Sequence, residues 1–438
     1  MPSSRIPRLL AVLLALAVFL GACTSSDATT TTSAGARVTT TTAGESTTTA
    51  AGPTTTTRPD LSGLDLPANV VAQLEDLMMK AQELRGLPFL ETPTITVLGD
   101  AEFKARVAEV TAEGLENLPA DQALYELLGL LPAGSNLEDM LGDLYEEQVA
   151  GFYDGRTKEI VVPSRSEGLS LVQQGTMIHE LVHALTDQHF EASAKREQMI
   201  DEDRFDEASA YLALLEGDAT LTEFHWVRTL SQRDLGLFLG ESLQADMGVI
   251  ESMPRFIRDS LLFPYDSGLQ FVQYLYDRGG WDAVNEAYRI MPDLPASTEQ
   301  IITPGDFRRD LPVEMTVREV EIPGYALVLT STWGELGLRL MFDQVLGEER
   351  SFQAADGWGG DYYHQWYDGR GRAAFILVLA MDTEDDLQEL RRALLDYQAR
   401  AIEDAYYVWV DEEGGYLHFV VAHDPVVGEQ LKTAYGLD

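Results

Sequence analysis

The chain has 438 residues, of which 45% are hydrophobic, so it is long enough to bury a sizeable core and to form two domains. Its formal net charge of −41 at pH 7 makes a surface that repels nucleic acid and anionic lipid headgroups, so we expect no nucleic-acid partner. The single cysteine, Cys23, excludes an internal disulfide.

The first 23 residues have the organisation of a secretory signal. Arg5 and Arg8 supply a positive start, and the apolar run from Leu9 to Leu20 is shorter than the ~20 residues needed to span a bilayer. The run ends in Leu20-Gly21-Ala22-Cys23, which resembles a bacterial lipobox, where small residues precede a cysteine that is lipidated and becomes the mature N-terminus. This resemblance implies a lipid anchor at Cys23 on a bacterial membrane, outside the cytoplasm. The alternative is an ordinary signal peptide with a chance cysteine.

Residues 24–60 are of low complexity. Threonine runs at 29–32, 39–42, 47–49 and 54–57 are separated by Ala, Gly, Ser and Pro. Such a segment cannot bury enough apolar surface to offset the entropy of ordering, so we expect a disordered tether. The folded part is then expected to begin near Leu61, with a mostly helical domain over 61–305 and an α+β lobe over 306–438.

The first half of the folded part is predicted to be mostly helical. Apolar residues recur with helical spacing between Asn69 and Arg85, and Gly86 ends the pattern. Residues 94–98 are predicted as a strand and residues 101–131 as a broken helix. After the turn signal Asp154-Gly155, the β-prone run 158–163 is predicted to be an edge strand beside a functional site. Further helices are expected at 171–189, 206–230, 241–262, 265–278 and 280–290, before a loop over 292–304.

The tail mixes both kinds of element. Strands are predicted near 314–321, 373–381, 405–411 and 415–422, and helices near 333–346, 383–401 and 425–435. This mixture predicts an α+β layer that packs on the first part or forms a second lobe, and the fold class of the chain is therefore α+β.

The helix predicted over 171–189 carries the motif His179-Glu180-Leu181-Val182-His183. Residues four apart on a helix are separated by about 400° and ~6 Å of rise, so both imidazoles project from one face and can bind one zinc ion. Glu180 is one position on, where its carboxylate can reach a zinc-bound water rather than the metal. This is the H-E-x-x-H arrangement of metallopeptidases. Asp187, one turn beyond His183, either orients a ligand histidine or is a surface residue.

A catalytic zinc site needs a third protein ligand, and the sequence offers His189, Glu207 and Glu216. His189 has the spacing of the third histidine in the metzincin pattern H-E-x-x-H-x-x-G-x-x-H. Thr186, however, stands where that pattern has a glycine with positive φ. Glu207 and Glu216 lie nine residues apart on the next predicted helix, about 900° around its axis, so only one of them can face the metal.

The combination of His-Glu-x-x-His with Glu216-Gly217-Asp218-Ala219 on a later helix is similar to the gluzincin metallopeptidases, which include thermolysin-like enzymes and aminopeptidases. The resemblance implies that His179, His183 and Glu216 are the zinc ligands and that Glu180 is the general base. Tyr265-Asp266-Ser267-Gly268 matches the Tyr-x-x-Gly motif of the aminopeptidase branch. It therefore implies that Tyr265 hydrogen-bonds the tetrahedral intermediate. These motifs cover residues 177–220 and 265–268.

Other short stretches are similar to a largely uncharacterised set of bacterial exported gluzincin-like proteins, among them residues 151–154 and 357–361. The chain has no Gly-x-Met-Glu-Asn-type segment, so the resemblance does not extend to capture of a substrate N-terminus. We expect a zincin-like, lipid-anchored zinc metallopeptidase that hydrolyses peptides or proteins outside the cytoplasm. The alternative is a catalytically inactive zinc-binding or envelope-interaction lipoprotein.

Overall fold

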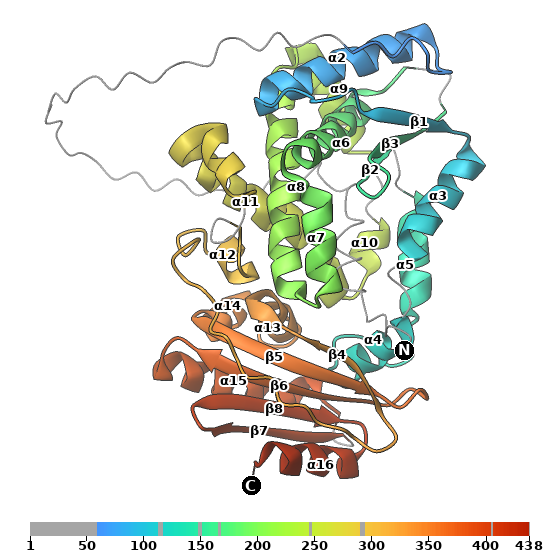
Figure 1. Ribbon diagram of the computed structural model, residues 1–438. Helices are drawn as coiled ribbons and strands as arrows, with labels where there is room; N and C mark the ends of the chain where they lie inside the picture. The colour runs from blue at the N-terminus through green and yellow to red at the C-terminus, as the bar shows by residue number, and fades with distance from the viewer. Residues whose placement is uncertain are drawn as a thin grey trace, which may run out of the picture.

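The computed structural model describes residues 59–112, 117–147, 151–164, 168–244, 248–289, 294–403 and 406–437. The predicted signal segment, Cys23 and the tether up to residue 58 lie outside these residues. Within the described ranges, no helix is both long enough and apolar enough to cross a membrane. The predicted α+β class is confirmed: a helical part with a small sheet stands on a larger C-terminal sheet (Figure 1).

Two long helices, α6 and α8, form the centre of the helical part, with α11 packed against α8 and α2 across α6 (Figure 1). The helices of this part are α2 (Ala68–Arg85), α3 (Asp100–Ala112), α4 (Leu118–Leu127), α5 (Leu137–Glu147), α6 (Leu171–Phe190), α7 (Ala192–Asp201), α8 (Phe205–Val227), α9 (Gln232–Ser242), α10 (Gly248–Ser252), α11 (Arg255–Glu286) and α12 (Thr298–Ile302). The predicted helices at 69–85, 171–189 and 206–230 are confirmed within a few residues.

The motif helix α6 has well-defined ends. It starts with a capping box, in which the Ser170 hydroxyl accepts a hydrogen bond from the Gln173 N–H while the Gln173 side chain accepts one from the Ser170 N–H. It ends at Glu191, which adopts the left-handed conformation with φ 53°. At Thr186 the helix continues, and the threonine hydroxyl donates a hydrogen bond to the Val182 carbonyl over 3.0 Å. The chain therefore does not turn back toward the histidines at residue 186.

The small sheet has the order β1-β3-β2, with β1 (Thr94–Leu98) parallel to β3 (Glu159–Pro163) and β2 (Phe152–Asp154) antiparallel to it. The prediction of an edge strand at 158–163 is wrong, because this segment is the central strand β3. Its apolar run suits a strand that is buried on both faces, and Ile160 and Val161 are completely buried. The edge strand next to α6 is β2.

Three predicted boundaries in the helical part are wrong. The helices at 241–262 and 265–278 are predicted to be separate, yet α11 continues through Pro264 to a kink at Gly279-Gly280. Residues 232–242 form α9, with the Ser231 hydroxyl accepting a hydrogen bond from the Asp234 N–H, and residues 298–302 form α12 inside the predicted loop. The packing of α11 along α8 outweighs the hydrogen bond that a proline removes.

The C-terminal sheet is antiparallel throughout, with the order β4-β5-β6-β8-β7. Its elements are β4 (Ala326–Ser331), α13 (Gly334–Asp343), α14 (Glu348–Ala355), β5 (Trp358–Tyr367), β6 (Ala373–Met381), α15 (Glu384–Ala401), β7 (Tyr407–Glu413), β8 (Tyr416–Ala422) and α16 (Pro425–Tyr435). The predicted strand at 314–321 is wrong, since this segment has no regular structure, and β4 and β5 were not predicted.

One continuous core joins the two parts of the chain. The same cluster of buried side chains contains Leu212 of α8, Phe256 of α11 and Leu377 of β6. The opposite face of the sheet packs in a separate cluster, which contains Ile376 of β6 together with Leu431 of α16. The helical part therefore rests on one face of the C-terminal sheet, and α16 covers the other (Figure 1).

Candidate metal centre

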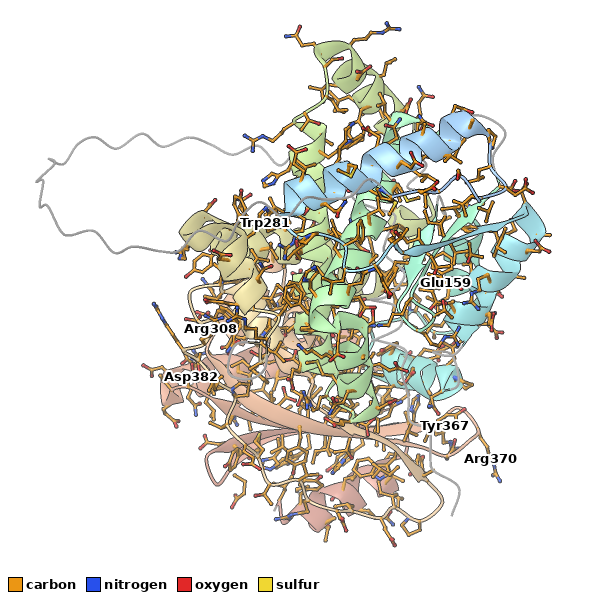
Figure 2. The ribbon with its side chains drawn as sticks, turned by 45° about the horizontal axis from the view of Figure 1, so that its top comes forward. Glu159, Trp281, Arg308, Tyr367, Arg370 and Asp382 are labelled. Atoms are coloured by element: carbon orange, nitrogen blue, oxygen red, sulfur yellow. The ribbon has the colours of Figure 1, made fainter. Side chains whose placement is uncertain are left out.

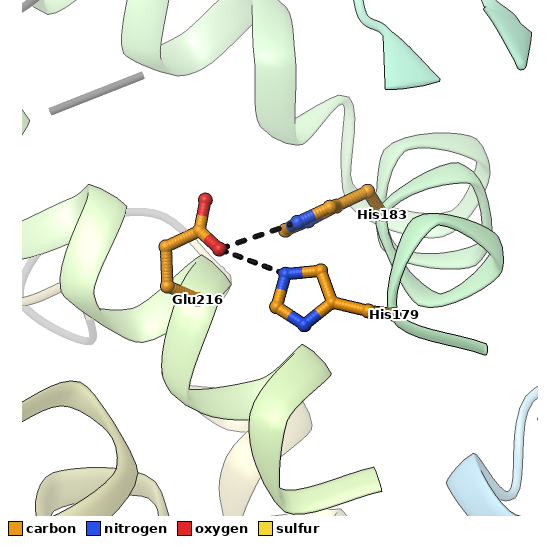
Figure 3. A group of neighbouring side chains, drawn as sticks. All are labelled: His179, His183 and Glu216. Atoms are coloured by element: carbon orange, nitrogen blue, oxygen red, sulfur yellow. Dashed lines mark hydrogen bonds and ion pairs between the residues drawn. The ribbon is translucent and has the colours of Figure 1, made fainter. Parts of the chain in front are cut away.

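The two histidines of the α6 motif and a glutamate from α8 meet in the interior of the helical part (Figure 3). Nε2 of His179 lies 2.9 Å from Oε2 of Glu216, and Nε2 of His183 lies 3.4 Å from the same oxygen. One ligand atom from each residue falls within a group that spans no more than 4.8 Å. His179 and Glu216 are 2% and 3% exposed, whereas His183 is half-buried. The structure therefore brings together the three residues that the gluzincin resemblance implied as ligands.

The donor chemistry of this cluster fits a zinc ion. Two imidazole nitrogens and one carboxylate oxygen make the His₂Glu set of catalytic zinc sites, which leaves a fourth position open. Nε2 of His183 is buried and, apart from its 3.4 Å ion-pair contact with Glu216, makes no hydrogen bond among the described residues. Burial lowers the pKa of His179, but the carboxylates of Glu216 and Glu223 raise it by more than burial lowers it. The resulting pKa is about 10. The position therefore favours a positive charge, which a proton or a metal ion can supply.

The rotation of α8 is fixed by contacts of the two residues that follow Glu216. A Cβ atom on Gly217 would lie 2.1 Å from the carbonyl oxygen of Gly268, so α8 and α11 touch here without any intervening side chain. On α8 the next residue, Asp218, forms a fully buried ion pair with Arg85, with 2.6 Å between Nε and Oδ1. The Tyr288 hydroxyl donates to the same carboxylate over 2.8 Å. These contacts hold Glu216 toward α6.

Glu180 lies beside the cluster but outside the set of ligand atoms. It is 1% exposed, and its Oε2 accepts a hydrogen bond of 2.7 Å from the backbone N–H of Tyr153 on β2. Its Oε1 is buried and has no hydrogen-bond partner within the described chain. Burial raises the pKa of Glu180 to about 7. One carboxylate oxygen is thus held by the edge strand and the other remains available.

Tyr265 reaches the same region from α11. Its ring stacks on His179, with centroids 6.2 Å apart and an interplanar angle of 25°. Its hydroxyl is buried and lacks a hydrogen-bond partner in the part of the chain that the structure describes. Burial, followed by the charges of Glu216 and Glu180, raises the pKa of Tyr265 well above its usual value. Tyr265 is therefore a neutral hydrogen-bond donor beside the ligands, and Gly268 explains why α11 comes close enough to present it.

The two alternative ligands point elsewhere. The His189 Nε2 donates a hydrogen bond to the Pro88 carbonyl over 2.7 Å. Glu207 accepts two hydrogen bonds from the guanidinium of Arg204, over 2.9 and 2.7 Å. Neither belongs to the group of potential ligand atoms around His179.

Asp187 holds neighbouring structural elements together and does not orient a ligand histidine. It accepts a hydrogen bond from the Tyr153 hydroxyl over 2.6 Å and one from the Ser193 N–H over 3.0 Å. The Lys158 ammonium group also contacts it. Asp187 thus fixes β2 and the start of α7 against α6, and so holds the strand that donates to Glu180.

Three further residues at the site were not predicted. Oε2 of Glu223 lies 3.8 Å from Nδ1 of His179. Its spacing of seven residues from Glu216, about 700° around α8, could have revealed that both face α6. Tyr153 contributes only its backbone N–H to Glu180, and no sequence pattern signals such a contact. The third residue is Arg196 on α7, whose pKa burial lowers to about 10. Its electrostatic interactions with Glu216 and Tyr265 raise the pKa in part, so the guanidinium charge lies near both residues.

The comparisons with known proteins bear on the C-terminal lobe alone. A family described as a domain of unknown function (DUF8575) matches residues 326–429, from β4 into α16. No curated protein and no solved structure matches the chain. The matched residues do not include α6 or α8, which carry the candidate metal centre.

Proposed function

We propose that this protein is a zinc metallopeptidase of the gluzincin type that hydrolyses peptide bonds in peptides or proteins. The observation that supports this most directly is the convergence of both motif histidines on one carboxylate oxygen of Glu216, at 2.9 and 3.4 Å. A purely structural metal site would need no carboxylate beyond those of its ligands. Here Glu180 stands beside the three ligands without belonging to them.

Zinc bound by His179, His183 and Glu216 would supply a Lewis acid that polarises the scissile carbonyl and lowers the pKa of a water molecule. Glu180 takes the proton from the attacking water and passes it to the leaving amine. Its Oε1 is suited to this role because it is not engaged by another group, while the Tyr153 N–H holds Oε2 in place. The edge strand β2 therefore positions the general base.

The developing negative charge on the substrate carbonyl needs a donor on the other side of the site. Tyr265 remains protonated and presents a buried hydroxyl, which can donate a hydrogen bond to that oxygen. The positive charge of Arg196 nearby stabilises Glu216 and the same developing charge. Substrate approaches from the side of His183, whose side chain is 13% exposed, compared with 3% for His179 and 4% for Glu216.

The proposal is tested with the zinc-loaded full chain and an unfolded protein substrate such as casein. Glu180→Gln keeps the shape and the zinc but cannot accept the proton, so we expect a loss of about 100-fold or more in kcat. Glu197→Gln, an exposed residue on α7, removes the same charge and should leave the rate unchanged. Hydrolysis by Glu180→Gln at the wild-type rate would remove the general base from the mechanism.

We also propose that the enzyme is attached to a bacterial membrane through lipidated Cys23 and acts outside the cytoplasm. The support is the sequence Leu20-Gly21-Ala22-Cys23 at the end of a signal-length apolar run. Cys23→Ala should move the protein from the membrane fraction to the soluble fraction without altering its thermal unfolding. Unchanged retention of this variant in membranes would argue against lipidation.

A further inference from the structure

A second group of possible metal ligands, separate from the histidine cluster, lies where α12 and the segment after it meet the end of β6. Glu299 belongs to α12, Asp310 to the segment that follows it, and Asp382 to the turn between β6 and α15. One carboxylate oxygen from each of the three lies within 4.8 Å of the others. Figure 2 shows Asp382 at the edge of the molecule, on the same side as Arg308. The group therefore joins chain segments more than 70 residues apart.

The carboxylate of Glu299 differs from the other two, because it is buried and one of its oxygens lacks a hydrogen bond among the described residues. The residue is 5% exposed, and its Oε2 has no hydrogen-bond partner among the described residues. Burial of an ionised carboxylate without a partner is costly, so the group must either stay protonated or meet a cation. Burial, followed by the charges of Glu335, Asp310 and Asp382, raises the pKa of Glu299 to about 9.

A further acid, Glu335 of α13, strengthens the negative potential at this place. It is 1% exposed, and it is the carboxylate that acts most strongly on Glu299. Two arginines in the neighbourhood are paired with other acids. Arg339 lies 3.8 Å from Glu335, and Arg308 lies 3.5 Å from Glu286. The three carboxylates thus repel one another across a short distance, and a divalent cation between them would remove that repulsion.

We propose that Glu299, Asp310 and Asp382 bind a calcium ion. The donors are all carboxylate oxygens, without histidine or cysteine, which selects a hard cation over zinc. Calcium takes oxygen ligands at roughly 2.3–2.6 Å in flexible geometry, so two ligands on opposite sides of the ion stand about 5 Å apart. The three oxygens all lie within 4.8 Å of one another, so each of them can reach a single ion placed between them. Magnesium requires near-ideal octahedral geometry, which three side chains from separate segments are poorly placed to provide.

Such an ion would connect the C-terminal sheet to the helix that carries Glu216. Beside Glu299 on α12, Thr298 donates hydrogen bonds from its hydroxyl and its N–H to Asp206, over 2.6 and 3.0 Å. Asp206 lies in the first turn of α8. Asp382, in turn, follows β6 directly, and its N–H donates to the Gly357 carbonyl at the start of β5. Calcium would therefore stabilise the junction of the two parts, independently of the proposed zinc site.

Calcium binding to the zinc-loaded full chain is measured by calorimetric titration and by thermal unfolding. We expect binding of one calcium ion and, at a hundredfold excess over Kd, a rise in Tm of about 5 °C. Asp382→Asn and Glu299→Gln should weaken calcium binding by at least tenfold and abolish the rise in Tm. Asp385→Asn, an exposed acid three positions from Asp382 that removes the same charge, should behave like the wild type.

Two outcomes would overturn the proposal. The first is a wild-type protein that neither binds calcium nor gains thermal stability from it. The second is a response to calcium that is the same in Asp382→Asn as in the wild type. An equal response to magnesium would contradict the choice of calcium. Zinc content measured on the same samples keeps this result separate from the fate of the zinc site.

Discussion

The carboxylate of Glu223 lies 3.8 Å from Nδ1 of His179, while the other ring nitrogen of this histidine faces Glu216. A carboxylate in this position fixes the orientation and tautomer of a ligand histidine and increases its basicity. Glu223→Ala should therefore weaken zinc binding by about 10- to 100-fold, as measured by competition with a chelator. Glu223→Gln, which keeps an acceptor for the Nδ1–H, should restore much of the affinity. Wild-type affinity in Glu223→Ala would show that the contact does not orient the ring.

Tyr265→Phe tests the proposed oxyanion donor. The change removes one hydroxyl and leaves the ring stacked on His179, so zinc content and KM should stay close to those of the wild type. The kcat should fall by about 100-fold, the usual effect of removing one such donor. Tyr274→Phe, on the same helix but next to Arg278, is the matched control. A rise in KM or a fall in zinc content without a fall in kcat would indicate that Tyr265 only supports the packing.

Gly217→Ala tests the contact between α8 and α11. The new Cβ would lie 2.1 Å from a backbone oxygen of Gly268, so the helices must move apart. We expect the free energy of unfolding in urea to fall by about 3 kcal/mol or more, with a loss of zinc as Glu216 shifts. Gly236→Ala on α9 has no atom within 4 Å of the new Cβ and should be neutral or slightly stabilising. Equal stability of the two variants would contradict the close approach.

Asp121 of α4 should make the stability of the protein depend on pH. It is buried against β5, where Gln365 donates a hydrogen bond of 3.3 Å to it, and burial raises its pKa from 3.8 to about 7. The folded state therefore holds a proton that the unfolded state loses, and stability falls as the pH rises from about 4 to about 7. Asp121→Asn removes this titration. Relative to the wild type it should gain on the order of 4 kcal/mol between pH 4 and pH 8 in denaturant unfolding, because the pKa differs by about three units between the two states. A pH-independent difference would contradict this.

The sequence predicted the parts of the site that depend on local pattern. The helices α6 and α8 have clear helical spacing, and Thr186 correctly excluded the turn that would have brought His189 to the metal. The resemblance to gluzincins implied Glu216 and Tyr265, and the structure places both beside His179.

Contacts between distant segments could not be predicted in the same way. The strand β5 was not predicted, because buried polar residues interrupt its apolar pattern. Asp361, for example, accepts hydrogen bonds from the backbone N–H groups of Trp333 and Gly334. Its burial depends on these distant partners, so the sequence alone does not identify it as a core residue. Conversely, residues 314–321 alternate like a strand, yet Val317 is 45% exposed and the segment pairs with no other strand in the described structure.

The zinc content of protein purified without added metal, measured by mass spectrometry, tests the central claim most directly. The account predicts one zinc ion per chain in the wild type and most of it lost in Glu216→Ala. His189→Ala and Glu207→Ala should retain the metal, because His189 is hydrogen-bonded to the Pro88 carbonyl and Glu207 to the Arg204 guanidinium. A wild-type protein without zinc, or loss of zinc in His189→Ala alone, would contradict the gluzincin-type site.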